Sequence, residues 1–66
     1  MKVFLRNRET NQYYAGSNGW SGDSSVAHDF DTVESATQFA RTQRLAGMEV
    51  VLHDDDHPRD LVLPLR

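Results

Sequence analysis

The 66-residue sequence contains no cysteine, which excludes disulfide bonds and zinc sites built from thiolates. Long apolar runs are also missing, since no stretch approaches the roughly 20 apolar residues that a membrane-spanning helix needs. The apolar start of the chain, residues 3–5, is interrupted at Arg6 and is too short for the core of a secretory signal. These absences predict a cytoplasmic protein that does not bind a membrane.

Lysine is nearly absent as well. The sequence has one lysine, and its formal net charge is -3 at pH 7. Binding to a nucleic acid backbone needs clustered Lys and Arg side chains, so this composition argues against nucleic acid as the main partner. Folding can still gather separated cations, and we keep as an alternative a groove lined by Arg6, Arg8, Arg41 and Arg44.

The short length limits both the number of domains and the stability. The chain forms one domain, residues 1–66, and a domain of this size buries only about 60% of the surface that its unfolded chain exposes. Small domains commonly gain stability from disulfides, metals or partner chains. Without disulfides, this domain depends on efficient packing, on a metal site of carboxylates and imidazoles, or on self-association.

The apolar pattern predicts a hairpin at each end of the chain and a helix between them. Alternating apolar residues separated by polar turns are typical of hairpin strands. We expect strands at residues 2–7, 13–15, 26–30, 48–53 and 60–63. The glycine-rich and serine-rich stretch at residues 16–25 is expected to be a loop.

A helix is predicted from residue 32 to residue 46. Asp31 or Thr32 can accept hydrogen bonds from the first free backbone amides, and Glu34 stands at capping-box spacing from Asp31. Gly47 is expected to end the helix in the left-handed conformation. The residues that share one stripe of this helix are Val33, Ala36, Phe39, Ala40 and Gln43.

One helix on one face of a mostly antiparallel sheet accommodates this order of elements, so we predict an α+β fold. Strand residues alternate between the two faces of a sheet. The residues expected to face away from the helix are Phe4, Val51, Val62 and one of Tyr13 and Tyr14. Either residues 16–25 fold over that face with Trp20 as a lid, or another molecule covers it.

The segment from His53 to His57 contains residues with metal-binding chemistry. In an extended strand His53, Asp55 and His57 point the same way, and two imidazoles with a carboxylate can hold a divalent cation. Aspartates are equally typical of a hairpin turn, where their side chains accept hydrogen bonds from nearby amides. We predict a turn and no cofactor, and we keep a metal site as an alternative.

The sequence contains no pattern that is typical of an enzyme. Asp29, Asp31 and Glu34 are carboxylates close in sequence, but the chemistry of a helix start accounts for Asp31 and Glu34. Ser24, Ser25 and His28 lie close in sequence without the surroundings of a catalytic nucleophile. We therefore predict that the protein is not an enzyme.

Three aromatic residues, Tyr13, Tyr14 and Trp20, are the best candidates for binding a partner. Aromatic side chains anchor protein interfaces and stack on bases, sugars and proline-rich peptides. A small domain also needs large side chains to close its core. Trp20 is therefore interpreted either as a lid on the core or as an exposed anchor.

The first two thirds of the chain contain a spaced pattern of aromatics and alanines: Tyr13-Tyr14-Ala15-Gly16, Trp20, Ala27, Phe30-Asp31-Thr32-Val33-Glu34-Ser35-Ala36 and Phe39-Ala40. This pattern resembles one found in short, uncharacterised bacterial and phage proteins. They share an aromatic hairpin, a loop with a tryptophan, and a phenylalanine before a capped helix. The resemblance implies no activity and no binding residue.

These observations favour a small interaction module whose partner is another protein or its own copy. The predicted contact residues are Phe4, Tyr13, Tyr14, Trp20, Val51 and Val62. The two alternative hypotheses are a nucleic-acid-binding accessory protein and a regulator that binds a divalent metal.

Overall fold

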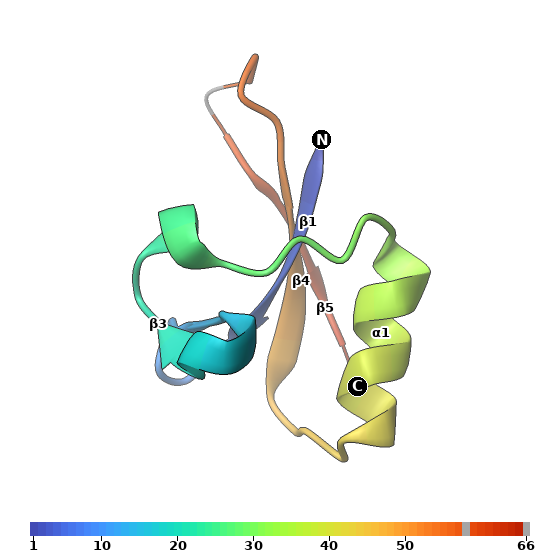
Figure 1. The fold of residues 1–66 in the computed structure, drawn as a ribbon. Helices are drawn as coiled ribbons and strands as arrows, with labels where there is room; N and C mark the ends of the chain where they lie inside the picture. Colours follow the sequence, from blue (N-terminus) through green and yellow to red (C-terminus); the bar gives the residue numbers. More distant parts are fainter. Residues whose placement is uncertain (58, 66) are drawn as a thin grey trace.

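The computed structural model describes residues 1–57 and 59–65 and contains a five-stranded antiparallel sheet with one α-helix packed against it (Figure 1). Its elements are β1 (Lys2–Asn7), β2 (Tyr13–Tyr14), η1 (Gly16–Asn18), β3 (Trp20–Ser21), η2 (Ser24–Val26), α1 (Val33–Thr42), β4 (Met48–His53) and β5 (Leu61–Pro64). The strands lie in the order β3-β2-β1-β4-β5, which confirms the predicted α+β fold. Within the described residues, no helix is long and apolar enough to cross a membrane.

The two central strands, β1 and β4, pair along their whole lengths, from Lys2 opposite His53 to Asn7 opposite Met48. Both occupy the predicted ranges. The last strand is displaced by one residue and includes Pro64. Leu65 donates its backbone N–H to the Met48 carbonyl at 3.1 Å, so alternate residues of β5 bond to β4 and Pro64 faces the free edge. Proline is tolerated there because an edge position needs no donor.

The third strand expected at residues 26–30 is wrong, and the loop expected at residues 16–25 contains regular structure. That stretch includes η1, η2 and β3, and β3 pairs with β2 so that Trp20 lies opposite Tyr14. The Ala15 amide donates to the Gly19 carbonyl at 2.7 Å, and Gly19 has a φ of 74°. Glycine adopts this positive φ without steric cost, so it permits the tight turn that brings Trp20 back beside β2.

Residues 27–32, which we call the crossing segment, carry the chain from the η2 side of the sheet to the α1 side (Figure 1). β2 pairs with only the last part of β1, so the outer edge of β1 near Val3 lies beyond its reach. Phe30 donates its N–H to the Val3 carbonyl at 2.8 Å, and Val3 donates its N–H to Asp29 Oδ1 at 3.0 Å. The crossing segment therefore satisfies the edge of β1 in place of a strand.

The first turn of α1 is capped by Thr32, whose hydroxyl accepts a hydrogen bond from the Ser35 amide at 3.1 Å. The capping box expected between Asp31 and Glu34 is wrong. Asp31 has a φ of 68° and lies outside the helix, where its amide donates to Asp29 Oδ1 at 2.9 Å. The crossing segment therefore determines which residue caps the helix.

The helix ends at Thr42, four residues earlier than predicted, and Gly47 does not terminate it. Leu45 donates its N–H to the Ala40 carbonyl at 2.9 Å, and Arg44 donates to the Arg41 carbonyl at 3.1 Å. These are the two hydrogen bonds of a Schellman motif, and its left-handed residue is Arg44, with a φ of 55°.

The main core lies between α1 and the sheet. The buried residues of this helix-side core are Val3, Leu5, Ala36, Ala40, Met48 and Val50. Two of them are alanines of α1, whose small side chains let the helix approach the sheet closely. The predicted alternation is confirmed, because Phe4 and Val51 lie on the opposite face, where they are buried with Tyr13.

The cover of this opposite face is not the predicted one. Ala27, at the start of the crossing segment, packs there, while Trp20 contacts Tyr14 and Tyr14 packs on the helix-side core. Trp20 is therefore not a lid on the face that points away from the helix. The tyrosine on the opposite face is Tyr13, which meets the Phe4 ring edge-on at 5.7 Å between ring centres.

An ion pair completes the cover of the opposite face. Arg6 Nε donates to Glu49 Oε2 at 2.6 Å, and the two side chains are only 22% and 12% exposed. The Arg6 guanidinium also lies 5.6 Å from the centre of the Tyr13 ring, close enough for a cation–π interaction. A layer of paired and stacked side chains thus takes the place of a second helix.

Replacing Arg44 by glycine is expected to raise the free energy of unfolding by up to about 1 kcal/mol, because glycine adopts a positive φ without the strain of a side chain. Arg44→Ala removes the same charge but keeps the strain, so it is the matched control and is expected to give no gain. Urea denaturation followed by circular dichroism measures both variants. Equal stabilities for the two would contradict this account of the helix end.

Candidate protein-interaction site

Tyr14 is the centre of a group of five rings on the helix side of the sheet, which we call the aromatic cluster. Its members are Tyr14, Trp20, His28, Phe30 and Phe39. The centre of the Tyr14 ring lies 4.6 Å from that of Phe39, 5.6 Å from Trp20, 5.8 Å from Phe30 and 5.9 Å from His28. The cluster joins β2, β3, the crossing segment and α1.

Backbone hydrogen bonds place these rings together. Tyr14 and Trp20 are opposite each other in the β2–β3 pair, so both side chains lie on the same face. His28 donates its backbone N–H to the Tyr14 carbonyl at 2.8 Å, which fixes the crossing segment beside β2. The His28 ring then meets the Phe30 ring edge-on, with centres 4.6 Å apart.

The cluster runs from the core to the surface. Tyr14, Phe30 and Phe39 are half-buried and pack against the helix-side core. Trp20 is 37% exposed, and His28, whose ring also meets that of Tyr14, is exposed too. This arrangement presents an indole that packs against the Tyr14 ring, together with an imidazole that can donate or accept a hydrogen bond.

The six predicted contact residues do not form one surface. Phe4, Tyr13 and Val51 are buried within the chain on the face away from α1. Val62, on the edge strand β5, is 37% exposed. Tyr14 and Trp20 belong to the aromatic cluster. Sequence reasoning missed the other three members of the aromatic cluster, which are His28, Phe30 and Phe39. His28 and Phe30 belong to the crossing segment, which was expected to be a strand.

The four arginines of the nucleic-acid hypothesis are also divided. Arg6 lies on the face away from α1, where Glu49 and Tyr13 hold its guanidinium. Arg8 follows β1, Arg41 lies on α1 and Arg44 follows that helix, and all three are exposed. The structure therefore does not gather the four side chains into a single groove.

The proposed metal ligands instead form hydrogen-bonded pairs of histidine and aspartate side chains. His53 Nδ1 lies 2.8 Å from Asp60 Oδ1, and its Nε2 lies 2.9 Å from Asp55 Oδ1. His57 instead pairs with Asp54, at 3.1 Å. Among residues 1–57 and 59–65, no group of three His, Cys, Asp or Glu side chains is arranged to hold a metal ion.

The His53 ring joins the two strands of the last hairpin. It stacks on Phe4 with ring centres 5.9 Å apart and planes inclined by 22°, while Asp60 approaches from the start of β5. The hydrogen bond to Asp60, and then that to Asp55, raise the pKa of His53 above its ordinary value of 6.5. The protonated imidazole is therefore favoured in the folded chain.

The sign of this pKa shift predicts how stability depends on pH. Because folding raises the pKa of His53, its contribution is fully present below pH 6.5 and is lost as pH rises through the folded-state pKa. We expect the free energy of unfolding, measured by urea denaturation, to fall as pH rises above about 6.5. Asp60→Asn is expected to flatten this dependence. An unchanged slope in that variant would show that His53 does not cause it.

No protein family model matches this sequence, and no curated protein and no solved structure matches it. The candidate site is therefore characterised by its own geometry: a partly exposed indole supported by Tyr14, with His28 beside the same tyrosine.

Proposed function

We propose that this protein is an interaction module that binds another protein through the aromatic cluster, with Trp20 as the anchor. The observation that carries the proposal is the position of Trp20, whose indole is 37% exposed while its ring packs edge-on against Tyr14. The largest apolar side chain of a small domain is thus held at the surface, although burying it would add stability.

A supported aromatic ring is well suited to anchor a partner. Residues that dominate binding energies are enriched in Trp and Tyr, and a side chain that is already ordered loses little conformational entropy on binding. Trp20 also lies in β3 at the edge of the sheet, next to backbone groups that can pair with an extended segment of a partner.

Two of the candidate catalytic residues, Asp29 and Ser25, have side chains with structural partners, which supports a binding role. Asp29 accepts hydrogen bonds from the Val3 and Asp31 amides, and those two bonds lower its pKa. Ser25 donates its hydroxyl to Asp23 at 2.7 Å. A cysteine-free sequence is in keeping with a reducing compartment, so the proposed role is placed in the cytoplasm.

Trp20→Ala is expected to leave the chain folded, to lower the free energy of unfolding by about 1–2 kcal/mol, and to abolish binding of the partner. Affinity capture with the wild-type protein and mass spectrometry identify candidate partners. Each candidate is then purified, and its affinity for the wild type and for each variant is measured by isothermal titration calorimetry, which needs no tryptophan in the variant.

Val26→Ala is the matched control, because Val26 is 43% exposed and lies outside the aromatic cluster. This control is expected to bind every confirmed partner with the affinity of the wild type. If a purified partner binds Trp20→Ala as tightly as it binds the wild type, the aromatic cluster is not the site.

A further inference from the structure

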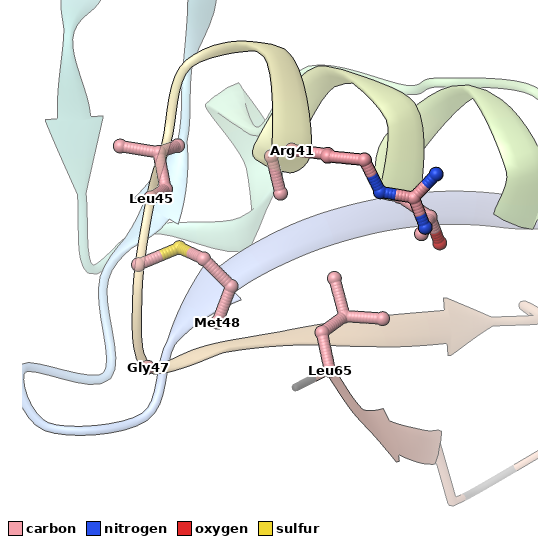
Figure 2. A pocket seen from close by; sticks show the side chains of 7 residues that line it. Arg41, Leu45, Gly47, Met48 and Leu65 are labelled. Atoms are coloured by element: carbon pink, nitrogen blue, oxygen red, sulfur yellow. The ribbon is translucent and has the colours of Figure 1, made fainter.

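A pocket of about 230 Å³ opens on the β5 side of the molecule, where α1 stops and β4 starts. Figure 2 shows Met48 and Leu65 below the helix, with the Arg41 side chain extending along the helix above Leu65. The backbone carbonyls of Gly47 and Met48 already accept hydrogen bonds, from Arg8 and Leu65. Among the described residues that line the pocket Arg41 carries the only charge, and a single exposed cation does not specify a ligand.

The turn at the opposite margin of the sheet contains a pair of residues with chemistry of its own, Asn18 and Gly19. An asparagine followed by glycine can react within the chain, because glycine has no side chain to keep its backbone nitrogen away from the asparagine side chain. Asn18 is exposed, and a Cβ atom added at Gly19 would meet no other atom within 4 Å. The pair therefore lies in open space that water can reach.

In this reaction the backbone nitrogen of Gly19 loses its proton to solvent and attacks Cγ, the side-chain carbonyl carbon of Asn18. A new bond forms between that nitrogen and Cγ, the bond from Cγ to Nδ2 breaks, and the leaving group takes up protons from solvent and departs as ammonia. Water then hydrolyses the cyclic imide at either of its two carbonyl carbons. The products are aspartate and isoaspartate, and isoaspartate has one extra methylene group in the main chain.

The attacking nitrogen is held by one backbone hydrogen bond. The Gly19 N–H donates to the Gly16 carbonyl at 3.0 Å in the short helix η1, which contains no buried residue. Local opening of an exposed turn costs much less free energy than unfolding of the whole domain. Rotation about the Cα–C bond of Asn18 during such an opening frees the nitrogen for attack, while the paired strands stay in place.

The other two asparagines of the chain have different surroundings. Neither Asn7 nor Asn11 precedes a glycine, so the next side chain hinders the backbone nitrogen in both cases. In addition, Asn7 Oδ1 accepts hydrogen bonds from the Glu9 and Thr10 amides at 2.8 and 3.3 Å, which hold that side chain in place. Asn18 is the one asparagine of the sequence that combines a glycine neighbour with an exposed turn.

We propose that Asn18 is a site of spontaneous deamidation, and that its conversion to isoaspartate displaces Trp20. The Gly19 carbonyl accepts a hydrogen bond from the Ala15 amide at 2.7 Å, which closes the turn that places Trp20 opposite Tyr14. An extra methylene group lengthens this turn, so the hydrogen bond and the contact between the two rings cannot both keep their geometry. Loss of partner binding on deamidation rests on the proposed function, whereas the reaction and the displacement do not.

Ageing the purified protein tests the reaction. The folded chain is incubated at mildly alkaline pH, and mass spectrometry of digested samples follows the conversion of each asparagine, with electron-based fragmentation to distinguish isoaspartate from aspartate. Asn18 is expected to convert while Asn7 and Asn11 remain asparagine. The chain unfolded in guanidinium chloride is the control for intrinsic reactivity. If Asn18 stays intact in the folded chain after the unfolded chain has converted, the turn protects it and the proposal is wrong.

The fluorescence of Trp20, the single tryptophan, tests the displacement. Anion exchange isolates the isoaspartate form, and its emission is expected to shift to longer wavelength, because the indole loses its contact with Tyr14 and becomes more hydrated. Freshly prepared Asn18→Asp is the matched control, since it adds the same charge to a normal main chain and is expected to keep the wild-type spectrum. Asn18→Gln, whose longer side chain cyclises more slowly, is expected to age without change.

An isoaspartate form with the wild-type emission spectrum would show that the turn accommodates the extra methylene group, and would overturn the proposed displacement. Both measurements use the protein alone, so their outcome does not depend on any partner. If a purified partner binds Trp20→Ala as tightly as the wild type, the proposed function fails, and the deamidation and fluorescence results still stand.

Discussion

The central strands β1 and β4 are apolar on both faces, and the chain has one α-helix with which to cover them. Leu5, Val50 and Val51 are completely buried, although Val51 faces away from the helix that covers the other two. A chain of this size has too few residues to form a second complete layer over the other face. The second face is covered instead by a short segment and by paired side chains.

The crossing segment is the main solution to that constraint. It places Ala27 against the uncovered face, uses Asp29 and Phe30 to satisfy the edge of β1, and then delivers the chain to the start of α1. The Arg6–Glu49 ion pair and the stacking of His53 on Phe4 cover the remainder. Buried charge is acceptable here because Arg6 and Glu49 satisfy each other at 2.6 Å.

One helix over two central strands also leaves the margins of the sheet open, and the proposed binding surface lies at one of them. On the β2–β3 side, the gap beside α1 is filled by the aromatic cluster, whose outer ring, Trp20, reaches solvent. On the β5 side, the gap becomes the pocket beneath Arg41.

The sequence by itself determined β1, β4 and the existence of α1, because alternation and helical periodicity are local signals that do not depend on distant residues. It also determined that Phe4 and Val51 share a face, since that follows from strand geometry. Tertiary structure decided the rest. Asp29 accepts a hydrogen bond from β1 because β2 is too short to reach Val3. The helix α1 ends at the left-handed residue Arg44 because Leu45 packs on the helix-side core. These outcomes depend on contacts between residues far apart in the sequence, and local propensity carries no information about such contacts.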